Sequence, residues 1–328
     1  MIDPRREWSR REFLASTALA LGWTALGGGV WANGQPPVMP VRPLGKTGLQ
    51  VSLLGLGAYP VGSLADEDKA IGVVHRLLDV GVNYLDTAPS YSNGTSELRV
   101  GKAIRGKRDR VILATKTLPR GRKAAMKDLE ASLVRLGTDH VDLWQIHSIR
   151  NHKDVDALFD DNGSVRAGED AIKAGKVRFL GVTGHTNPEL HLRVIKEYDF
   201  ATMLMPLNPA DPHFVSFEEK VLPAAVEKKM GVIAMKVLAA GRLPKQKTIL
   251  VGECIRYAAS LPISCAIVGL KTLVEVEAAA SAVLPFRPIA DEERLKFLAL
   301  TEDHPGKSLE WYKREKITPR SSKPRRSF

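Results

Sequence analysis

The stretch Val82-Asn83-Tyr84-Leu85-Asp86-Thr87-Ala88-Pro89-Ser90-Tyr91 decides how the rest of this 328-residue chain is interpreted. Residues 82–85 have the composition of a short buried strand, and this strand ends in the acid Asp86. Pro89 and Ser90 then indicate a turn, and Tyr91 follows the acid five residues later. The stretch therefore predicts a strand whose carboxyl end brings an acid and a tyrosine together.

Two later stretches end in polar side chains in the same way. Residues 111–116 form an apolar stretch that ends in Lys116, and residues 141–147 form one that ends in His147. Because the carboxyl ends of parallel strands meet at one edge, we expect these two side chains to lie near Asp86 and Tyr91.

The chain alternates between short apolar stretches and stretches with helical periodicity. Strand-like stretches occur near residues 53–56, 82–85, 111–115, 141–146, 178–182, 202–205, 231–235 and 264–268. Helical periodicity occurs near residues 66–79, 95–105, 122–136, 166–175, 188–197, 217–229, 247–259 and 272–283. Such alternation favours parallel strands joined by right-handed crossovers. Together with a β-hairpin at residues 41–53, the eight units predict a (β/α)8 TIM barrel.

An open, doubly wound sheet is the alternative to a closed barrel. Such a sheet would be expected to carry a glycine-rich phosphate loop after its first strand, with a third glycine at the start of the helix. The corresponding stretch, Gly55-Leu56-Gly57-Ala58-Tyr59-Pro60, lacks this third glycine and has a proline there. The sequence therefore favours the barrel.

The N-terminus has the features of a targeting segment. Ser9-Arg10-Arg11-Glu12-Phe13-Leu14 precedes an uncharged stretch, residues 15–31, that is rich in Ala, Leu and Gly, and Ala32 completes a small-residue cleavage site. The paired arginines resemble the twin-arginine export signal. We expect residues 1–32 to be a signal peptide for the twin-arginine export machinery, and the mature protein to be periplasmic and without a membrane span. An uncleaved membrane anchor is the alternative.

The formal net charge of +11 is concentrated near the C-terminus. Residues 313–328 contain seven Lys and Arg residues and a single acid, and they predict a basic disordered tail. Residues 33–312 carry only +4, which fits a single barrel domain and gives no indication of nucleic-acid binding. Cys254 and Cys265 are expected to be small core residues, with one disulfide as the alternative.

The four polar residues at the strand ends suggest a reaction. A tyrosine, with an ordinary pKa of about 10, is a poor proton donor near neutral pH. A lysine ammonium near Tyr91 would lower this pKa, and an acid behind the lysine would hold it charged. A histidine could bind a substrate carbonyl oxygen. Asp86, Tyr91, Lys116 and His147 therefore suit proton delivery to an oxygen that develops negative charge, as in carbonyl reduction.

Several motifs of the sequence resemble those of the aldo-keto reductases. They are Asp86-x4-Tyr91, Ser96-Glu97-x3-Gly101-Lys102-Ala103, Ala114-Thr115-Lys116, Leu136 to Leu143, Leu143-Trp144-Gln145-Ile146-His147 and Gly175 to Val182, within a match over residues 41–285. The resemblance implies an oxidoreductase that uses NADP(H) or NAD(H) to reduce a small carbonyl compound. It also implies that Tyr91 is the general acid, that Lys116 tunes it, that Asp86 pairs with Lys116 and that His147 orients the carbonyl.

The same resemblance implies a set of cofactor contacts, some of which depart from the family pattern. They are Ala58, Tyr59, Asp86, Thr183, Gly184, Met205, Met235, Lys236, Leu238, Lys271 and Thr272. Thr183-Gly184 stands where the family usually has Ser-Asn, and Met205 and Met235 stand where it usually has Gln and an aromatic residue. Glu277 replaces an arginine expected near the 2′-phosphate, so NAD is as open as NADP.

Two other functions are compatible with parts of the sequence. A metal-dependent barrel hydrolase could use the histidines, namely His147, His152, His185 and His213, but the first strand lacks a metal-binding pair, and no metal is expected. A nucleotide-binding sensor or accessory subunit with little turnover is the other alternative, because potassium-channel β subunits resemble this fold.

Overall fold

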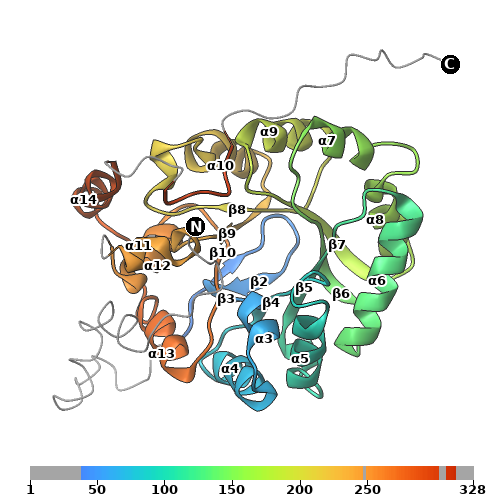
Figure 1. The fold of residues 1–328 in the computed structure, drawn as a ribbon, viewed down its shortest axis with the longest axis horizontal. Helices are drawn as coiled ribbons and strands as arrows, with labels where there is room; N and C mark the ends of the chain where they lie inside the picture. Colours follow the sequence, from blue (N-terminus) through green and yellow to red (C-terminus); the bar gives the residue numbers. More distant parts are fainter. Residues whose placement is uncertain (1–37, 247–248, 303–307, 315–328) are drawn as a thin grey trace.

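The computed structural model describes residues 38–246, 249–302 and 308–314. Eight parallel strands form a closed barrel in the order β10-β3-β4-β5-β6-β7-β8-β9 (Figure 1). The barrel strands are β3 (Leu54–Gly57), β4 (Tyr84–Asp86), β5 (Ile112–Thr117), β6 (Val141–Ile146), β7 (Val177–Thr183), β8 (Thr202–Pro206), β9 (Gly231–Met235) and β10 (Cys265–Val268). The prediction of a (β/α)8 TIM barrel is confirmed.

Helices surround the barrel and connect its strands (Figure 1). They are α3 (Tyr59–Ser63), α4 (Glu67–Asp79), α5 (Thr95–Ala103), α6 (Arg122–Leu136), α7 (His152–Leu158), α8 (Ser164–Lys173), α9 (Pro188–Glu197), α10 (Phe217–Glu227), α11 (Arg242–Lys245), α12 (Val251–Ser260), α13 (Leu273–Ser281) and α14 (Asp291–Glu302), with 3-10 turns η1 (Arg108–Arg110), η2 (Asp211–His213) and η3 (Ala239–Gly241). The helices α3, α7, α11 and α14 were not predicted from the sequence.

Alternating residues of each strand face two separate apolar cores. Every second residue of a strand faces the barrel interior. Tyr84, Leu143 and Ile233 are such residues and belong to one apolar cluster. Their neighbours along the strands, such as Trp144 and Val232, belong to the larger cluster between the barrel and its helices. This separation follows from the two-residue period of a strand. It also determines which residues at the strand ends face the opening of the barrel.

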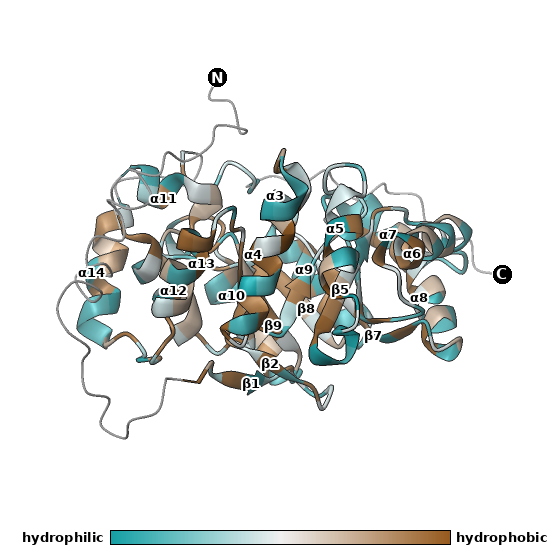
Figure 2. Ribbon diagram, turned by 90° about the horizontal axis from the view of Figure 1, so that it is seen from below, coloured by the Kyte–Doolittle hydropathy of each residue, from teal (hydrophilic) through white to brown (hydrophobic). Residues whose placement is uncertain are grey.

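A short hairpin closes the end of the barrel where the strands begin. Its strands are β1 (Val41–Pro43) and β2 (Gln50–Ser52), which pair antiparallel and lie beneath the barrel in Figure 2. Leu44, in the turn between them, is fully buried in the interior cluster. Gly45 has a φ of +53°, and a Cβ there would lie 2.2 Å from the backbone nitrogen of Gly231, so only glycine fits. The open mouth is therefore the opposite end, where the strands finish.

Side-chain caps fix where several helices begin. The Asp66 carboxylate accepts a hydrogen bond from the Lys69 N–H (3.0 Å) at the start of α4. Asn187 caps α9 in the same way, and proline occupies the first helical position there. Asp and Asn are favoured at these positions because their side chains bind the unpaired N–H groups of a first helical turn.

The C-terminal end of the barrel domain differs from the prediction. Lys313, expected in a disordered tail, is buried, and its ammonium contacts Asp211 (2.5 Å) and Glu310 (2.7 Å). The Arg314 N–H donates to the Thr186 carbonyl (2.7 Å). The barrel domain therefore includes both residues, because two buried carboxylates hold Lys313. The rest of the expected tail, 315–328, lies outside the described residues.

Three further expectations concern the cysteines and the N-terminus. Cys254 and Cys265 are free and buried, as expected for small core residues. The expected export signal, residues 1–32, lies outside the described residues. Among the helices of the described ranges, none has the length and apolar character needed to cross a membrane.

Candidate active site

The barrel brings Asp86, Tyr91, Lys116 and His147 to one part of its mouth. Asp86 is the last residue of β4, Lys116 lies near the end of the adjacent β5, and His147 directly follows β6. The register pairs Asp86 with Ala114 and Lys116 with Gln145. Asp86 and Lys116 alternate in phase with the interior residues of their strands, so both side chains face inward. Four residues chosen on sequence grounds are thus neighbours in space.

A buried ion pair forms the base of this site. The Lys116 ammonium binds the Asp86 carboxylate and also donates to the Thr87 carbonyl (2.8 Å). The second oxygen of Asp86 accepts a hydrogen bond from the Gln145 Nε2 (2.7 Å). Both charged side chains are almost completely buried. The carboxylate is therefore held by a charge on one oxygen and an amide on the other, which fixes its orientation.

Gln145 belongs to the motif Leu143-Trp144-Gln145-Ile146-His147, but no role was predicted for it. Its side chain is fully buried, faces the barrel interior and reaches Asp86, which is 59 residues earlier in the chain. The inward position of Gln145 follows from the strand alternation, since it lies two residues before His147. That alternation is the signal that could have found it.

Tyr91 lies over the ion pair. The Lys116 Nζ is 4.7 Å from the centre of the Tyr91 ring. The His147 ring is 6.1 Å away, and the Tyr59 ring is 5.4 Å away, both nearly perpendicular. The loop after Tyr91 turns sharply into α5 through Gly94, whose φ is +86°. Tyr91 and His147 each keep part of their surface exposed, so the pair faces the opening.

The environment shifts the proton affinities of these groups. Burial lowers the pKa of Lys116, but Asp86 and Tyr91 raise it by more, so the ammonium stays charged. Burial raises the pKa of Tyr91, and Lys116 opposes this only in part. The prediction from the sequence, that the lysine lowers the pKa of Tyr91 overall, is wrong. Burial is the larger effect, so Tyr91 keeps its proton at neutral pH and is available as an acid.

His147 is neutral in this environment. Burial and then the positive charge of Lys116 lower its pKa well below the ordinary value. Its backbone is fixed, because the N–H donates to Thr117 (2.9 Å) and the carbonyl accepts from Arg120 (2.8 Å). The ring Nδ1 is buried and lacks a hydrogen-bond partner among the described residues. A neutral imidazole held in this way can donate one hydrogen bond to a carbonyl oxygen.

The expected cofactor contacts divide into two groups. Thr183 ends β7, and Met235 ends β9 and packs against the interior cluster, so both lie at the mouth. The side chain of Met205 does not lie at the mouth. The alternation along β8 directs it into the outer core, where it is fully buried. The apolar Leu204 occupies the inward position instead. The proposed contact of Met205 with a cofactor is therefore wrong for its side chain.

The remaining expected contacts lie on the loops around the mouth. Tyr59 is largely exposed and packs edge to face against Tyr91, whereas Ala58 is fully buried, so a cofactor could reach Ala58 only through its backbone. Gly184 follows Thr183, and a Cβ there would lie 2.5 Å from the ring of His191. Leu238 packs partly against the outer core after β9.

The segment before α13 retains features of a phosphate site. Thr272 caps this helix by accepting a hydrogen bond from the Glu275 N–H (3.2 Å), and the Lys271 N–H donates to the Glu275 carboxylate (2.5 Å). Glu277, which was predicted to lie near a 2′-phosphate, forms an ion pair with Arg76 of α4 (2.5 Å). Its negative charge is therefore partly offset by a partner that the sequence did not indicate.

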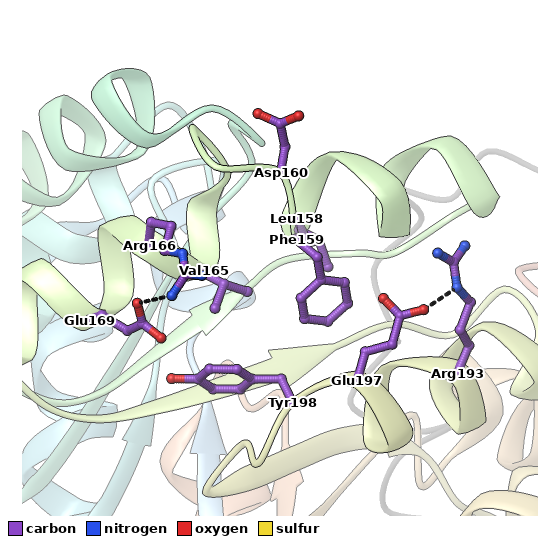
Figure 3. A pocket seen from close by; sticks show the side chains of 9 residues that line it. All are labelled: Leu158, Phe159, Asp160, Val165, Arg166, Glu169, Arg193, Glu197 and Tyr198. Atoms are coloured by element: carbon purple, nitrogen blue, oxygen red, sulfur yellow. Dashed lines mark hydrogen bonds and ion pairs between the residues drawn. The ribbon is translucent and has the colours of Figure 1, made fainter. Parts of the chain in front are cut away.

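A cavity elsewhere on the molecule contains none of these residues. It has a volume of about 440 Å³ and lies between α7, α8 and α9 on the outside of the barrel (Figure 3). Its charged side chains pair with each other, as in Arg166–Glu169 (2.8 Å) and Arg193–Glu197 (2.6 Å). In the described ranges, no group of three or more His, Cys, Asp or Glu side chains could hold a metal ion. The mouth is therefore the candidate active site.

Comparison with known sequences identifies relatives of the chain. The aldo/keto reductase family model matches residues 53–251. The chain is 33% identical over 230 residues to the aldo-keto reductase YhdN of Bacillus subtilis, covering 64% of this chain and 65% of that protein. It is 28% identical over 318 residues to the L-galactose dehydrogenase of Arabidopsis thaliana, covering 83% and 96% respectively. The match to YhdN thus spans slightly less than two thirds of that relative.

Solved structures give the same result. The holo form of the aldo-keto reductase AKR11C1 from Bacillus halodurans superposes with a TM-score of 0.72 and 25% identity, covering 83% of this chain and 99% of that one. An aldo-keto reductase from Klebsiella pneumoniae in complex with NADPH gives a TM-score of 0.66 and 25% identity, covering 81% and 96%. With a family match over more than half of its length, this chain belongs to the aldo/keto reductase family of NAD(P)-dependent enzymes.

Proposed function

We propose that this protein reduces an aldehyde or ketone to an alcohol, with the proton supplied by Tyr91. The observation that carries this proposal is the fully buried Asp86–Lys116 pair directly beneath the Tyr91 ring, 4.7 Å from the Lys116 Nζ. A permanently charged lysine at this place stabilises the phenolate that remains after proton transfer. A protein that only binds a nucleotide does not need a buried lysine–aspartate pair beneath a tyrosine.

The residues divide the work of the reaction. The hydride for the carbonyl carbon would come from a reduced nicotinamide nucleotide, when one is bound. His147 donates a hydrogen bond to the carbonyl oxygen and thereby polarises and orients it. Tyr91, protonated because burial raises its pKa, gives its proton to the oxygen as negative charge develops. Lys116 stabilises the resulting phenolate, and Asp86 keeps Lys116 charged and in place.

The chemistry of the mouth fits a nicotinamide nucleotide. Met235 presents a flexible and polarisable side chain to the barrel interior, against which a planar ring can pack. The Thr183 hydroxyl, at the end of β7, can bond a carboxamide. Lys271 and Thr272 precede the nine-residue helix α13, whose first N–H groups and adjacent lysine suit a phosphate. These residues would hold the nucleotide across the mouth from β7 to the loop after β10.

We propose that NADP is accepted as well as NAD. The carboxylate of Glu277 would repel a 2′-phosphate, but its ion pair with Arg76 reduces this repulsion. Dissociation constants for NADPH and NADH, measured by quenching of protein fluorescence, test the point. Affinity for NADH more than about 100-fold above that for NADPH, a difference of about 2.7 kcal/mol, would contradict it.

We also propose that residues 1–32 direct export through the twin-arginine machinery. The motif Arg10-Arg11 before Phe13-Leu14 supports this, followed by an uncharged stretch. Because this route carries folded proteins, the nucleotide would be bound before export. Fusing residues 1–40 to a folded reporter should place the reporter outside the cytoplasm, and replacing both arginines by lysine should retain it. Export that ignores the two arginines would contradict this proposal.

Transfer of deuteride tests the reaction itself. The full chain is incubated with NADPH or NADH deuterated at the nicotinamide C4 and with a panel of aldehydes and ketones. We expect an alcohol that carries the deuterium on the carbon of the former carbonyl. Tight nucleotide binding without labelled alcohol from any carbonyl compound would favour a sensor or accessory subunit instead.

A further inference from the structure

The loop after β5 carries an arginine that binds the backbone next to His147. Arg120 lies four residues after Lys116, and its Nη2 donates to the carbonyl of His147 (2.8 Å) and to the carbonyl of Ser148 (2.9 Å). This nitrogen carries two hydrogens, so each carbonyl receives one of them. The guanidinium therefore holds the two peptide groups that follow the imidazole side chain.

The backbone conformation of Ser148 explains why one nitrogen reaches both carbonyls. Successive carbonyls of an extended strand point in opposite directions. Ser148 instead has a left-handed conformation, with a φ of +58°, so the chain turns sharply after His147. A serine rarely adopts this conformation, and the surrounding structure has to stabilise it. Arg120 does so, because it binds the carbonyls before and after the turn.

The same guanidinium contacts the far end of this loop. The Asp154 carboxylate lies 3.5 Å from the Arg120 Nη2 and accepts a hydrogen bond from the Arg150 N–H (2.9 Å). Asp154 lies in the first turn of α7, and its own N–H donates to Asn151, which caps that helix (2.9 Å). The loop after β6 is thus tied to Arg120 where it leaves the strand and where it enters the helix.

These contacts link two parts of the catalytic site. The His147 N–H donates to the Thr117 carbonyl (2.9 Å), and the His147 carbonyl accepts from Arg120. Thr117 and Arg120 belong to the short segment that directly follows Lys116 in the chain. This one segment therefore determines where the backbone of the histidine lies relative to the catalytic ammonium.

Arg120 is a poor source of stability for a side chain so deeply buried. Only 17% of its side chain is exposed, and its Nη1 is buried without a hydrogen-bond partner among the described residues. Burial lowers the pKa of Arg120, and Asp154 offsets this effect only in part. A desolvated charge that is paired so incompletely gives little stability in return. The position of this arginine is better explained by the loop that it holds.

We propose that Arg120 is a positioning residue for carbonyl reduction, which holds the loop after β6 so that the His147 ring meets the carbonyl oxygen of the substrate. This inference rests on the proposed function, since it explains how the polarising group of that reaction is kept in place. Arg120 acts through His147 and takes no part in the transfer of hydride or proton. A displacement of about 1 Å in a reacting group can lower a rate about 100-fold, so the loss of two hydrogen bonds should be visible in turnover.

The test removes the arginine and the histidine separately and together. We measure kcat and KM for 4-nitrobenzaldehyde, and the dissociation constant of NADPH, in the natural chain, Arg120→Met, His147→Gln and the double variant. Arg122→Met is the matched control. It removes the same charge two residues later, from an exposed side chain that pairs with Asp170. Arg120→Lys tests rescue, because it returns a charged donor on a slightly shorter side chain.

In Arg120→Met we expect kcat to fall about 10- to 100-fold, with the NADPH affinity unchanged. Arg122→Met should behave like the natural chain, and Arg120→Lys should recover part of the lost turnover. In the His147→Gln background, Arg120→Met should lower kcat little further, because the group that it positions is gone.

Two results would overturn the inference and leave the proposed reduction intact. One is full turnover in Arg120→Met. The other is an equal loss of kcat in the natural and His147→Gln backgrounds, because the arginine would then act independently of the histidine. If Arg120→Met does not fold, as judged by circular dichroism, Arg120→Gln replaces it in both backgrounds, since its shorter side chain cannot reach both carbonyls. A natural chain that reduces neither this aldehyde nor any other carbonyl compound would reject the proposed function, and this inference with it.

Discussion

Two buried lysines of this chain are each held by an aspartate, but they lie in different surroundings. Lys116 pairs with Asp86 beneath the partly exposed Tyr91. Lys313 pairs with Asp211 and Glu310 in a sealed cluster between the C-terminal segment and the loop after β8. Both pairs are desolvated and each has a tyrosine next to it, but Tyr312, which donates to Glu310 (2.9 Å), is buried, whereas Tyr91 is partly exposed at the mouth. A buried ion pair indicates function only when a group that can react lies beside it.

The two pairs also differ in how the chain builds them. Asp86 and Lys116 come from adjacent strands of the barrel, so the sheet register alone brings them together. Lys313 reaches Asp211 across 102 residues, from a segment that follows α14. The first pair is thus a product of the barrel itself. The second attaches the end of the chain to that barrel, and it positions Tyr312 beside His185.

Removing Lys116 should have the largest effect, because it affects both reaction and folding. Lys116→Met leaves Asp86 buried and unpaired, which should cost about 3–5 kcal/mol of unfolding free energy. Turnover per folded molecule should also fall about 10²–10⁴-fold, because the phenolate of Tyr91 loses its stabilising charge. Urea unfolding and carbonyl-dependent NADPH oxidation measure the two losses. Lys102→Met, which breaks an exposed pair with Glu67, serves as the control and should change either little.

Removing Lys313 should separate stability from catalysis. Lys313→Met leaves Asp211 and Glu310 buried together without a cation, so we expect a loss of about 3–5 kcal/mol in unfolding free energy. Well below its melting temperature, the variant should keep most of its turnover of an uncharged aldehyde. A loss of turnover as large as that of Lys116→Met would show that the two clusters are not functionally distinct.

Gln145 offers a smaller perturbation of the catalytic pair. Gln145→Met removes the hydrogen bond to the second oxygen of Asp86, which should cost about 2 kcal/mol of stability. Because that bond favours the ionised carboxylate, its loss should raise the pKa of Asp86. Turnover should therefore decline at a higher pH on the acid side of the profile than in the natural chain. If turnover declined at the same acidic pH in the variant and in the natural chain, Gln145 would contribute only packing.

His191, below the loop after β7, provides a test of pH dependence. It is fully buried, its Nδ1 hydrogen-bonds the Asn187 carbonyl (3.0 Å), and burial lowers its pKa from 6.5 to about 4. The unfolded chain therefore binds the proton first, so the stability from this group is complete above about pH 6.5 and is lost toward pH 4.

Between pH 7 and pH 5 the free energy of unfolding lost through His191 should amount to about 2 kcal/mol. We expect His191→Gln to lose less unfolding free energy than the natural chain over that interval, measured by urea denaturation at both pH values. Equal losses in the two proteins would mean that another group accounts for the acid sensitivity.

Much of the fold and the four central residues could be predicted because their signals are local. Apolar stretches and stretches with a 3.6-residue period predicted all eight barrel units. Asp86 and Lys116 could be predicted because each ends a strand-like stretch, and strand ends share one side of a barrel.

The remaining features depend on partners that are distant in the sequence. The burial of Lys313 depends on Asp211, and the neutralisation of Glu277 depends on Arg76. Neither pairing leaves a local pattern in the sequence. The predicted start of the tail at Lys313 was therefore wrong, and the predicted repulsion by Glu277 was incomplete because it left out Arg76. Met205 is a different case: its position was assigned by resemblance, and counting inward and outward residues along the strand would have rejected it.

The most direct test of the central claim compares the natural chain with Tyr91→Phe. We would measure kcat for carbonyl-dependent NADPH oxidation and the dissociation constant of NADPH for both. The account predicts a kcat about 10²–10⁴-fold lower in the variant, with the nucleotide affinity unchanged, because only the transferable proton is removed. A variant that turns over as fast as the natural chain would contradict the assignment of Tyr91 as the acid.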